Sequence, residues 1–188
     1  MMVLRLSGGR RLQSPPGDTA RPTPSRVRLA VMNMLAPQLP GSSWLDLCCG
    51  SGVMGCEALQ RGGRRVVAVD QDRRMAATAR ANLELVAASQ HPAAAVEIVQ
   101  QEVVRWLNQG NRTGAPFDLI YADPPYASGL YPQLAAAVGR GQWISTDGLL
   151  LLECASAEPP AVPEGWACIK EKRYGTSSVL MLQPSPTV

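Results

Sequence analysis

The sequence predicts a doubly wound α/β fold, in which helices cover both faces of a mostly parallel sheet. Five apolar runs of strand length alternate with segments of helical periodicity between residues 44 and 153. These runs are continuously apolar, as expected for parallel strands that are buried on both faces. Two more candidate strands near the C-terminus predict an antiparallel element at that end of the sheet. The 188 residues, 46% of them apolar, suffice for one domain with its own core.

Each element follows from a local signal. The predicted strands cover residues 44–48, 66–70, 94–99, 117–122 and 149–153, with the two late candidates at 167–171 and 178–182. Helices are expected at 53–60, 73–87, 103–107 and 130–138. Gly62 and Gly63 end the first of these helices. The longest helix places Met75, Ala79 and Leu83 on one face, which predicts that this face packs on the sheet.

The N-terminal segment differs from the rest of the chain. Residues 1–22 are rich in Arg, Gly and Pro and are predicted to form a short basic arm before a domain at 23–188. Leu4, Leu6 and Leu12 alternate as in a short hairpin that turns at Gly8-Gly9.

A helix is expected directly after the arm. Thr23 and Pro24 resemble an N-cap and a first helical residue, and Val27 and Val31 recur at helical spacing. Pro37 marks the end of that helix.

Positive charge is concentrated in the first 28 residues. They hold six arginines against one acid, Asp18, whereas the remaining 160 residues have a net charge of −2. The six are Arg5, Arg10, Arg11, Arg21, Arg26 and Arg28. A basic arm on a mildly acidic body indicates a polyanionic partner such as RNA. The alternative is a solvated arm that aids solubility.

Several classes of protein do not fit this sequence. No apolar run approaches the roughly 20 residues of a membrane helix, and the N-terminus lacks the apolar region of a signal peptide. We therefore expect a cytoplasmic protein without membrane association. The five cysteines form no C-x-x-C pair and the only histidine is His91, so we expect reduced thiols and no metal site.

A glycine-rich turn follows the first predicted strand. Gly50, Gly52 and Gly55 match G-x-G-x-x-G, and Asp70 ends the next strand, where a carboxylate can accept both ribose hydroxyls of an adenosine. Nicotinamide, flavin and S-adenosylmethionine (SAM) folds share this pattern. In the alternative interpretation the glycines only form a turn and Asp70 caps the next helix.

A buried acid favours SAM over a dinucleotide. Asp46 lies inside the first predicted strand, where a carboxylate is costly unless it is paired. The amino group of the methionine moiety of SAM could pair with it through a bound water.

The fourth predicted strand ends in a second motif, Asp123-Pro124-Pro125-Tyr126. The lone pair of an exocyclic base amine is delocalised into the ring, which makes the amine a poor nucleophile. If the Asp123 carboxylate and the Pro124 carbonyl accept its two N–H groups, they draw the lone pair toward a methyl donor. Two prolines hold that carbonyl in place, and Tyr126 offers a ring on which a base can stack. The alternative is a rigid turn with Tyr126 packed in the core.

The chemistry of methyl transfer fits the remaining composition. Transfer from a sulfonium is a direct displacement that needs no covalent nucleophile. Glu102 follows the third strand and could accept the adenine amine of SAM, with the Val103 N–H donating to the ring. Equally, Glu102 could be a carboxylate that stabilises the start of the next helix.

With these motifs the sequence resembles the RsmD-type family of bacterial small-subunit rRNA guanine-N2 methyltransferases. The likeness runs from Ser7-Gly8-Gly9-Arg10-Arg11-Leu12 through residues 21–28, 45–52 and 55–59 to Asp123-Pro124-Pro125-Tyr126 and Tyr174-Gly175-Thr176. It implies a Rossmann-like class I methyltransferase sheet and transfer from SAM to N2 of a guanine in 16S rRNA. The implied partner is the small ribosomal subunit or an assembly intermediate, and the protein is expected to act as a monomer without a metal.

The resemblance also implies roles for individual residues. Asp123, Pro124 and Tyr126 are the candidate catalytic residues. The candidate SAM-binding residues are Asp46, Cys48, Gly50, Ser51, Gly52, Asp70, Gln71, Glu102, Val103 and Asp123. The candidate RNA-binding residues are Arg10, Arg11, Arg21, Arg26 and Arg28.

Three other functions stay open at this point. Asp-Pro-Pro-Tyr also serves enzymes that methylate adenine N6 or cytosine N4, on RNA or DNA, although 188 residues leave little room for the extra target-recognition region of the DNA enzymes. The glycine motif alone would also suit a nicotinamide-dependent oxidoreductase. Finally, a non-catalytic assembly factor could keep the fold and bind rRNA.

Overall fold

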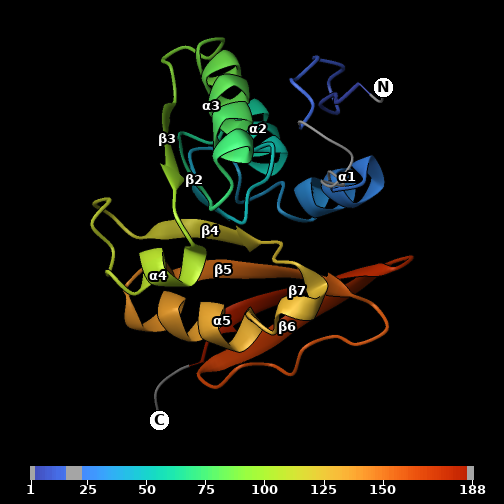
Figure 1. The fold of residues 1–188 in the computed structure, drawn as a ribbon, viewed down its shortest axis with the longest axis vertical. Helices are drawn as coiled ribbons and strands as arrows, with labels where there is room; N and C mark the ends of the chain where they lie inside the picture. The colour runs from blue at the N-terminus through green and yellow to red at the C-terminus, as the bar shows by residue number, and fades with distance from the viewer. Residues whose placement is uncertain (1–2, 16–22, 186–188) are drawn as a thin grey trace.

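The computed structural model describes residues 3–15 and 23–185. Its centre is a seven-stranded sheet of order β3-β2-β1-β4-β5-β7-β6 (Figure 1). The strands are β1 (Ser43–Leu47), β2 (Arg65–Asp70), β3 (Ala95–Gln100), β4 (Phe117–Ala122), β5 (Ile144–Ala155), β6 (Trp166–Tyr174) and β7 (Ser177–Pro184). The helices are α1 (Ser25–Met34), α2 (Val53–Gln60), α3 (Arg73–Ala87), α4 (Val103–Leu107), α5 (Tyr131–Arg140) and the 3-10 turn η1 (Tyr126–Ser128).

The pairing of the strands confirms the predicted fold class. Strands β3, β2, β1, β4 and β5 run parallel, and β7 is antiparallel to both β5 and β6. The chain moves from β1 outward to β2 and β3, and then returns to the other side of β1 for β4. Strand order therefore reverses between β1 and β4, where doubly wound folds place a ligand crevice at the carboxyl ends of the strands.

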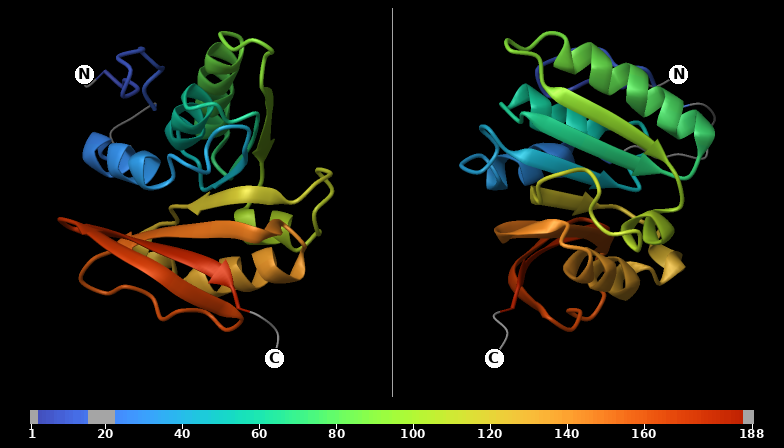
Figure 2. Two further views of the ribbon diagram at one scale, coloured as in Figure 1. Left: turned by 180° about the vertical axis from the view of Figure 1, so that it is seen from behind. Right: turned by 90° about the vertical axis from the view of Figure 1, so that its left-hand side faces the viewer.

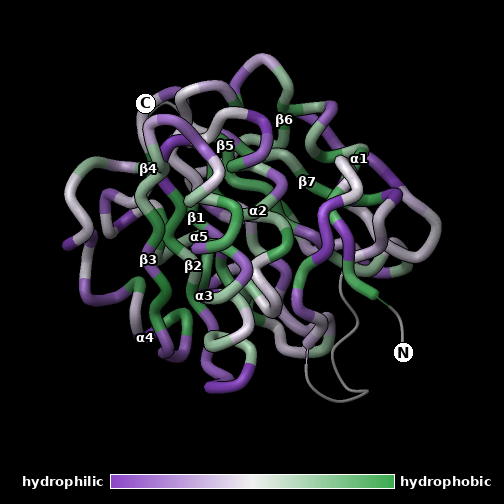
Figure 3. Tube along the Cα trace, turned by 90° about the horizontal axis from the view of Figure 1, so that it is seen from above, coloured by the Kyte–Doolittle hydropathy of each residue, from purple (hydrophilic) through white to green (hydrophobic). Residues whose placement is uncertain are grey.

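Helices cover the two faces of the sheet, as Figures 1 and 2 show. On one face, α1, α2 and α3 pack on side chains such as Trp44, Val66 and Leu119. On the other face, α4 and α5 cover alternate residues of the same strands, among them Leu45 and Ile120. This double burial explains the continuously apolar runs, and Figure 3 shows hydrophobic strands in the middle of the molecule.

The element boundaries differ from the prediction at a few points. Helices α2, α3 and α4 and strand β4 have the predicted bounds. Strand β5 extends to Ile144–Ala155, because a polar stretch at its start pairs with β4 before an irregularity in register. The expected capping of α1 by Thr23 is wrong: Pro24 is the N-cap, the helix begins at Ser25, and no side chain caps it.

The predicted N-terminal hairpin is present. The Leu6 N–H donates to the Arg10 carbonyl and the Leu12 N–H to the Leu4 carbonyl, each at 2.9 Å. Leu4, Leu6 and Leu12 are buried in the same cluster as α1, α2 and α3. The described part of the arm is therefore docked on the domain.

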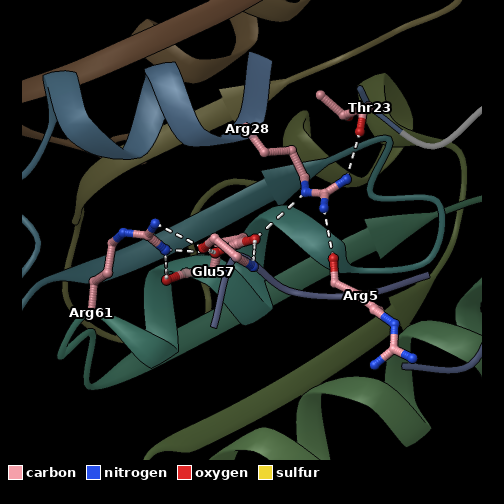
Figure 4. A network of polar contacts seen from close by, with 6 residues as sticks. Arg5, Thr23, Arg28, Glu57 and Arg61 are labelled. Atoms are coloured by element: carbon pink, nitrogen blue, oxygen red, sulfur yellow. Dashed lines mark hydrogen bonds and ion pairs between the residues drawn. The ribbon is translucent and has the colours of Figure 1, made fainter. Parts of the chain in front are cut away.

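A buried carboxylate in α2 anchors this hairpin (Figure 4). Glu57, 1% exposed, accepts the Ser7 N–H at 2.9 Å and the Arg61 guanidinium at 2.5 Å. Burial alone would raise the pKa of Glu57, but the hydrogen bonds from Ser7 and Arg61 lower it below its usual value. Arg28 also faces this carboxylate, with Nε 3.5 Å from a Glu57 oxygen.

Within the described residues, no helix is both long and apolar enough to cross a bilayer.

Candidate functional site

A pocket of about 610 Å³ opens at the carboxyl ends of the strands, on both sides of the reversal in strand order. The glycine turn after β1, the end of β2 and the motif after β4 line it together. The ends of β5 and β7 add Glu153 and Ser177. The tips of β1 and β4 therefore share one crevice.

The described charged side chains that line this pocket are all acidic. Five carboxylates line it: Asp46, Asp70, Glu102, Asp123 and Glu153. Among the described residues that line it there is no Lys, Arg or His. A cation offsets the mutual repulsion of these acids, whereas a pyrophosphate would increase it.

The glycine turn brings backbone close to the pocket. Cys48, Gly50 and Gly52 have φ of 59°, 54° and 73°, which is the left-handed conformation. Gly52 also lies against α3, where an added Cβ would be 3.1 Å from the Cβ of Ala79. Both the backbone twist and the close approach explain why glycine occupies position 52.

Asp70 is held rigidly at the edge of the pocket. Its carboxylate accepts the Gly50 N–H at 2.8 Å and the Asp72 N–H at 2.9 Å. Burial raises the pKa of Asp70 although these two bonds oppose the shift. Asp72, whose side chain accepts from Arg74 and Met75, caps α3. The alternative that Asp70 caps this helix is therefore wrong.

Asp46 and Ser51 place polar atoms in the pocket, and these atoms have few hydrogen-bond partners among the described residues. Asp46 is 2% exposed, and one of its oxygens accepts the Gly55 N–H at 3.1 Å. Burial raises the pKa of Asp46 well above its ordinary value. In the part of the chain that the structure describes, the buried Ser51 hydroxyl has no hydrogen-bond partner. A polar ligand would satisfy these groups, so the residues present fit one.

The Asp-Pro-Pro-Tyr motif forms the opposite wall. The Asp123 N–H donates to the Leu47 carbonyl at 3.3 Å, which joins this wall to the end of β1. Burial, together with the nearby Glu153 carboxylate, raises the pKa of Asp123 to about 8. Tyr126 is 46% exposed and lines the pocket, so the alternative that it packs in the core is wrong.

A buried polar cluster lies behind this wall, and sequence reasoning missed it. In the β4–β5 register Ala122 faces Leu152, which brings Glu153 beside Asp123. Glu153 is 2% exposed and accepts a hydrogen bond from the Tyr121 hydroxyl. Ser177 of β7 contacts the Tyr126 hydroxyl at 2.9 Å. The sequence does contain a signal for Glu153, because this residue, like Asp46, is an acid within a buried parallel strand.

Glu102 caps a helix, as one of its two interpretations predicted. It is the N-cap of α4, and its oxygens accept the Val104 N–H at 2.9 Å and the Arg105 N–H at 2.8 Å. Glu102 and Val103 also line the pocket. Each carboxylate oxygen keeps a second lone pair, so capping leaves room for a ligand contact.

Comparison with known proteins decides the family. The profile of the family described as conserved hypothetical protein 95 matches residues 5–183. Ribosomal RNA small subunit methyltransferase D of Haemophilus influenzae is 30% identical over 97% of this chain and 92% of its own length. The chain belongs to this methyltransferase D family. The methyltransferase D of Escherichia coli K12 is 28% identical over 93% of this chain and 85% of its own.

Structural comparison agrees with membership of the methyltransferase D family. A solved structure described as a putative methyltransferase, yhhF, from Escherichia coli has a TM-score of 0.81 at 27% identity. The likeness covers 99% of this chain and all of the other. The predicted Rossmann-like methyltransferase sheet is therefore confirmed over the whole fold.

The candidate RNA-binding arginines of this chain differ in their exposure to solvent. Arg11 and Arg26 are exposed, and Arg10, partly exposed, donates to the Ser89 hydroxyl at 2.8 Å. Arg21 lies outside the described residues.

The assignment of Arg28 to RNA is corrected. Its side chain is buried, because its guanidinium donates to the Thr23 carbonyl at 2.8 Å and to the Arg5 carbonyl at 2.7 Å and faces Glu57 (Figure 4). These contacts hold the hairpin on the domain, so Arg28 is a structural residue.

The cysteines around the glycine turn carry little reactive character. Cys49 and Cys56 are buried, and burial raises the pKa of Cys48 to about 12. Cys168, on β6, is exposed. Among the described residues, no group of three or more His, Cys, Asp or Glu side chains is arranged to hold a metal ion.

Proposed function

We propose that this chain is a SAM-dependent methyltransferase that acts on the exocyclic N2 amine of a guanine in small-subunit rRNA. One observation carries the proposal: Asp123 and Pro124 line the same pocket as Gly50 and Asp70. The methyltransferase D relatives named above support the class of reaction and of substrate.

The acidic wall after β1 and β2 suits SAM. When bound, SAM supplies a methyl group on a positively charged sulfonium. Asp70 would accept the ribose hydroxyls, and Asp46 would face the ammonium of the methionine moiety through water. Glu102 and the Val103 N–H would contact the adenine, while the glycine turn, with Cys48, Ser51 and Gln71, would enclose the ligand. The absence of basic side chains from the described lining favours this cation over a dinucleotide.

The wall after β4 suits the acceptor amine. The Asp123 carboxylate and the Pro124 carbonyl would accept the two amine N–H groups and direct its lone pair toward the methyl donor. Asp123 would also receive the proton that the methylated amine releases. The ring of Tyr126 would stack on the base, which must first leave its own stack to enter the pocket.

The basic N-terminal region suits the RNA backbone. Arg10, Arg11 and Arg26 would contact phosphates of 16S rRNA, with Arg21 added on the basis of the family resemblance. The substrate is then the small ribosomal subunit or an assembly intermediate, and the protein would act as a monomer.

The test is methyl transfer from labelled SAM to small subunits that lack the modification, followed by mass analysis of the nucleosides. We expect label in N2-methylguanosine of 16S rRNA. Label in N6-methyladenosine or N4-methylcytosine would overturn the choice of base. Binding of rRNA without incorporation would instead indicate an assembly factor, and a calorimetric titration that detects NAD but not SAM would indicate an oxidoreductase.

A further inference from the structure

A chain of hydrogen bonds connects the core to the tyrosine at the pocket mouth. The Tyr121 hydroxyl donates to the Glu153 carboxylate, and the Ser177 hydroxyl bonds to the same carboxylate. The Ser177 and Tyr126 hydroxyl oxygens are 2.9 Å apart. A serine has one hydroxyl proton, so if Ser177 donates it to Glu153, its oxygen accepts from Tyr126.

The two ends of this series of hydrogen bonds differ in burial. Tyr121, Glu153 and Ser177 are 1%, 2% and 6% exposed, and they lie on three neighbouring strands, β4, β5 and β7. Tyr126 is 46% exposed and lies in the single turn η1. A half-exposed side chain on so short a turn keeps much rotamer freedom unless a side-chain bond fixes it.

We propose that Ser177 and Glu153 are positioning residues that hold the Tyr126 ring in the orientation in which it stacks on the target base. This inference rests on the proposed function. A ring that is fixed beforehand places the amine in line with the methyl donor, whereas a free ring lets the bound base tilt. The effect is therefore expected in turnover at saturating RNA, because RNA affinity depends mainly on backbone contacts.

Two single variants and their combination test this bond. Tyr126→Phe removes only the hydroxyl and keeps the ring, and Ser177→Ala removes its partner. We expect each to lower kcat about five- to tenfold, with KM for RNA and Kd for SAM unchanged. The double variant should lose no more than either single variant, because both remove the same interaction.

Ser178→Ala is the matched control. Ser178 is the next residue of β7, is 1% exposed, and also bonds to one hydroxyl, that of Ser156, at 2.9 Å. It does not line the pocket, so its variant should keep the wild-type kcat.

Either of two results would overturn the inference: Ser177→Ala with the kcat of Ser178→Ala, or two losses that multiply in the double variant. If the wild-type protein transfers no methyl group, the proposed function fails and this inference fails with it.

A second and independent feature lies at the turn between β6 and β7. The Arg173 Nε–H donates to the Gly175 carbonyl at 3.3 Å, and Arg26 Nη2 is 3.0 Å from the position that a Cβ on Gly175 would take. Both arginines are exposed, and neither takes part in an ion pair within residues 3–15 and 23–185. The next residues, Thr176 and Ser177, line the pocket.

Two guanidinium groups at one turn repel each other unless an anion lies between them. Arginine favours phosphate oxygens because its planar donors match them in pairs. We infer that Arg26 and Arg173 bind a backbone phosphate of the RNA strand whose base enters the pocket, which again rests on the proposed function.

The test is binding of a 16S rRNA transcript over a range of salt concentrations. Arg26→Ala and Arg173→Ala should each weaken binding several-fold and reduce the salt slope by about 0.7 to 0.9, as for one lost phosphate contact. Arg112→Ala is the control, since Arg112 is exposed in the loop before β4, away from the pocket. If all three variants bind alike, the inference is wrong; if the wild-type protein binds no RNA, the proposed function fails as well.

Discussion

The two walls of the pocket are built by different means. On the β1–β2 side, Asp70 and Asp46 are fixed by backbone N–H groups of the adjacent glycine turn and helix. On the β4–β5–β7 side, Tyr121, Tyr126, Glu153 and Ser177 are fixed by side chains bonded to side chains. The residues of the first wall belong to one continuous segment, from β1 through the glycine turn and α2 to β2. Those of the second wall come together only through the pairing of strands in the sheet.

This difference suggests a division of work between the walls. SAM is the same small molecule in every turnover, which suits a site built from rigid backbone groups. A base delivered by a large RNA must be aligned on arrival, which suits side chains that the core holds in orientation. Variants of the first wall are therefore expected to change SAM affinity, and variants of the second wall are expected to change turnover.

The largest effect is expected at the second wall. Asp123→Asn keeps the size of the side chain but removes the charge that draws the amine lone pair, so kcat should fall about 100- to 1000-fold. Kd for SAM, measured by calorimetry, should change much less. Asp147→Asn, an exposed acid outside the pocket, is the control. An equal loss of SAM affinity and turnover in Asp123→Asn would contradict the division between the walls.

The converse is expected at the first wall. Asp70→Asn removes a charged acceptor, so Kd for SAM should rise about 10- to 100-fold, while kcat at saturating SAM stays near the wild-type value. Asp72→Asn serves as the control because Asp72 is exposed, lies two residues away and caps α3. It should lower stability without changing SAM binding. A change in kcat but not in Kd for Asp70→Asn would reverse the assignment.

Asp123 should also make the stability of the free protein fall between about pH 4 and about pH 8. Its pKa is about 8 when folded, against about 3.8 for a free Asp side chain, so the folded state retains a proton that the unfolded state releases. The resulting stabilisation is complete below pH 4 and is lost as the pH rises through about 8.

Thermal unfolding tests this sign. Between pH 6 and pH 9 the Tm of the wild-type protein should fall by roughly 3 to 8 °C more than that of Asp123→Asn. Bound SAM should shrink the difference, because its positive charge favours the carboxylate. Parallel Tm curves for the two proteins would show that Asp123 has no raised pKa.

The smallest effect separates two glycines of the first wall. Gly50→Ala adds a side chain in open space at φ 54°, and should cost about 1 to 2 kcal/mol of stability. Gly52→Ala combines similar strain with a contact at 3.1 Å to Ala79 and should cost more, roughly 2 to 4 kcal/mol. Denaturant unfolding measures both, and equal losses would mean that α3 yields to the added methyl group.

The two walls of the pocket also differ in how well the sequence predicted them. Gly50 and Asp70 could be predicted because the turn, the helix and the next strand form one continuous segment with a known pattern. Ser177 could not, because its contact with Tyr126 spans 51 residues and depends on the antiparallel pairing of β7 with β5. The fold was predictable in detail for the same reason, since buried strands and amphipathic helices are local patterns.

Counting charges along the sequence gave a wrong prediction for Arg28, because such a count does not show which side chains are buried. Arg28 belongs to a basic segment and was assigned to RNA, but a buried Glu57 29 residues later holds it inside the molecule. Neither the composition nor the helical period of α1 indicates this partner, and Glu57 lies in α2, where every residue from Val53 to Leu59 is buried. The pairing is a consequence of how the hairpin packs between α1 and α2.

A crystal structure of the protein with SAM bound tests the central claim most directly. We predict that the adenosine lies against Asp70 and Glu102 and that the methyl group points at the space between the Asp123 carboxylate and the Pro124 carbonyl. A methyl group directed away from Asp123, or SAM bound elsewhere on the molecule, would contradict the account.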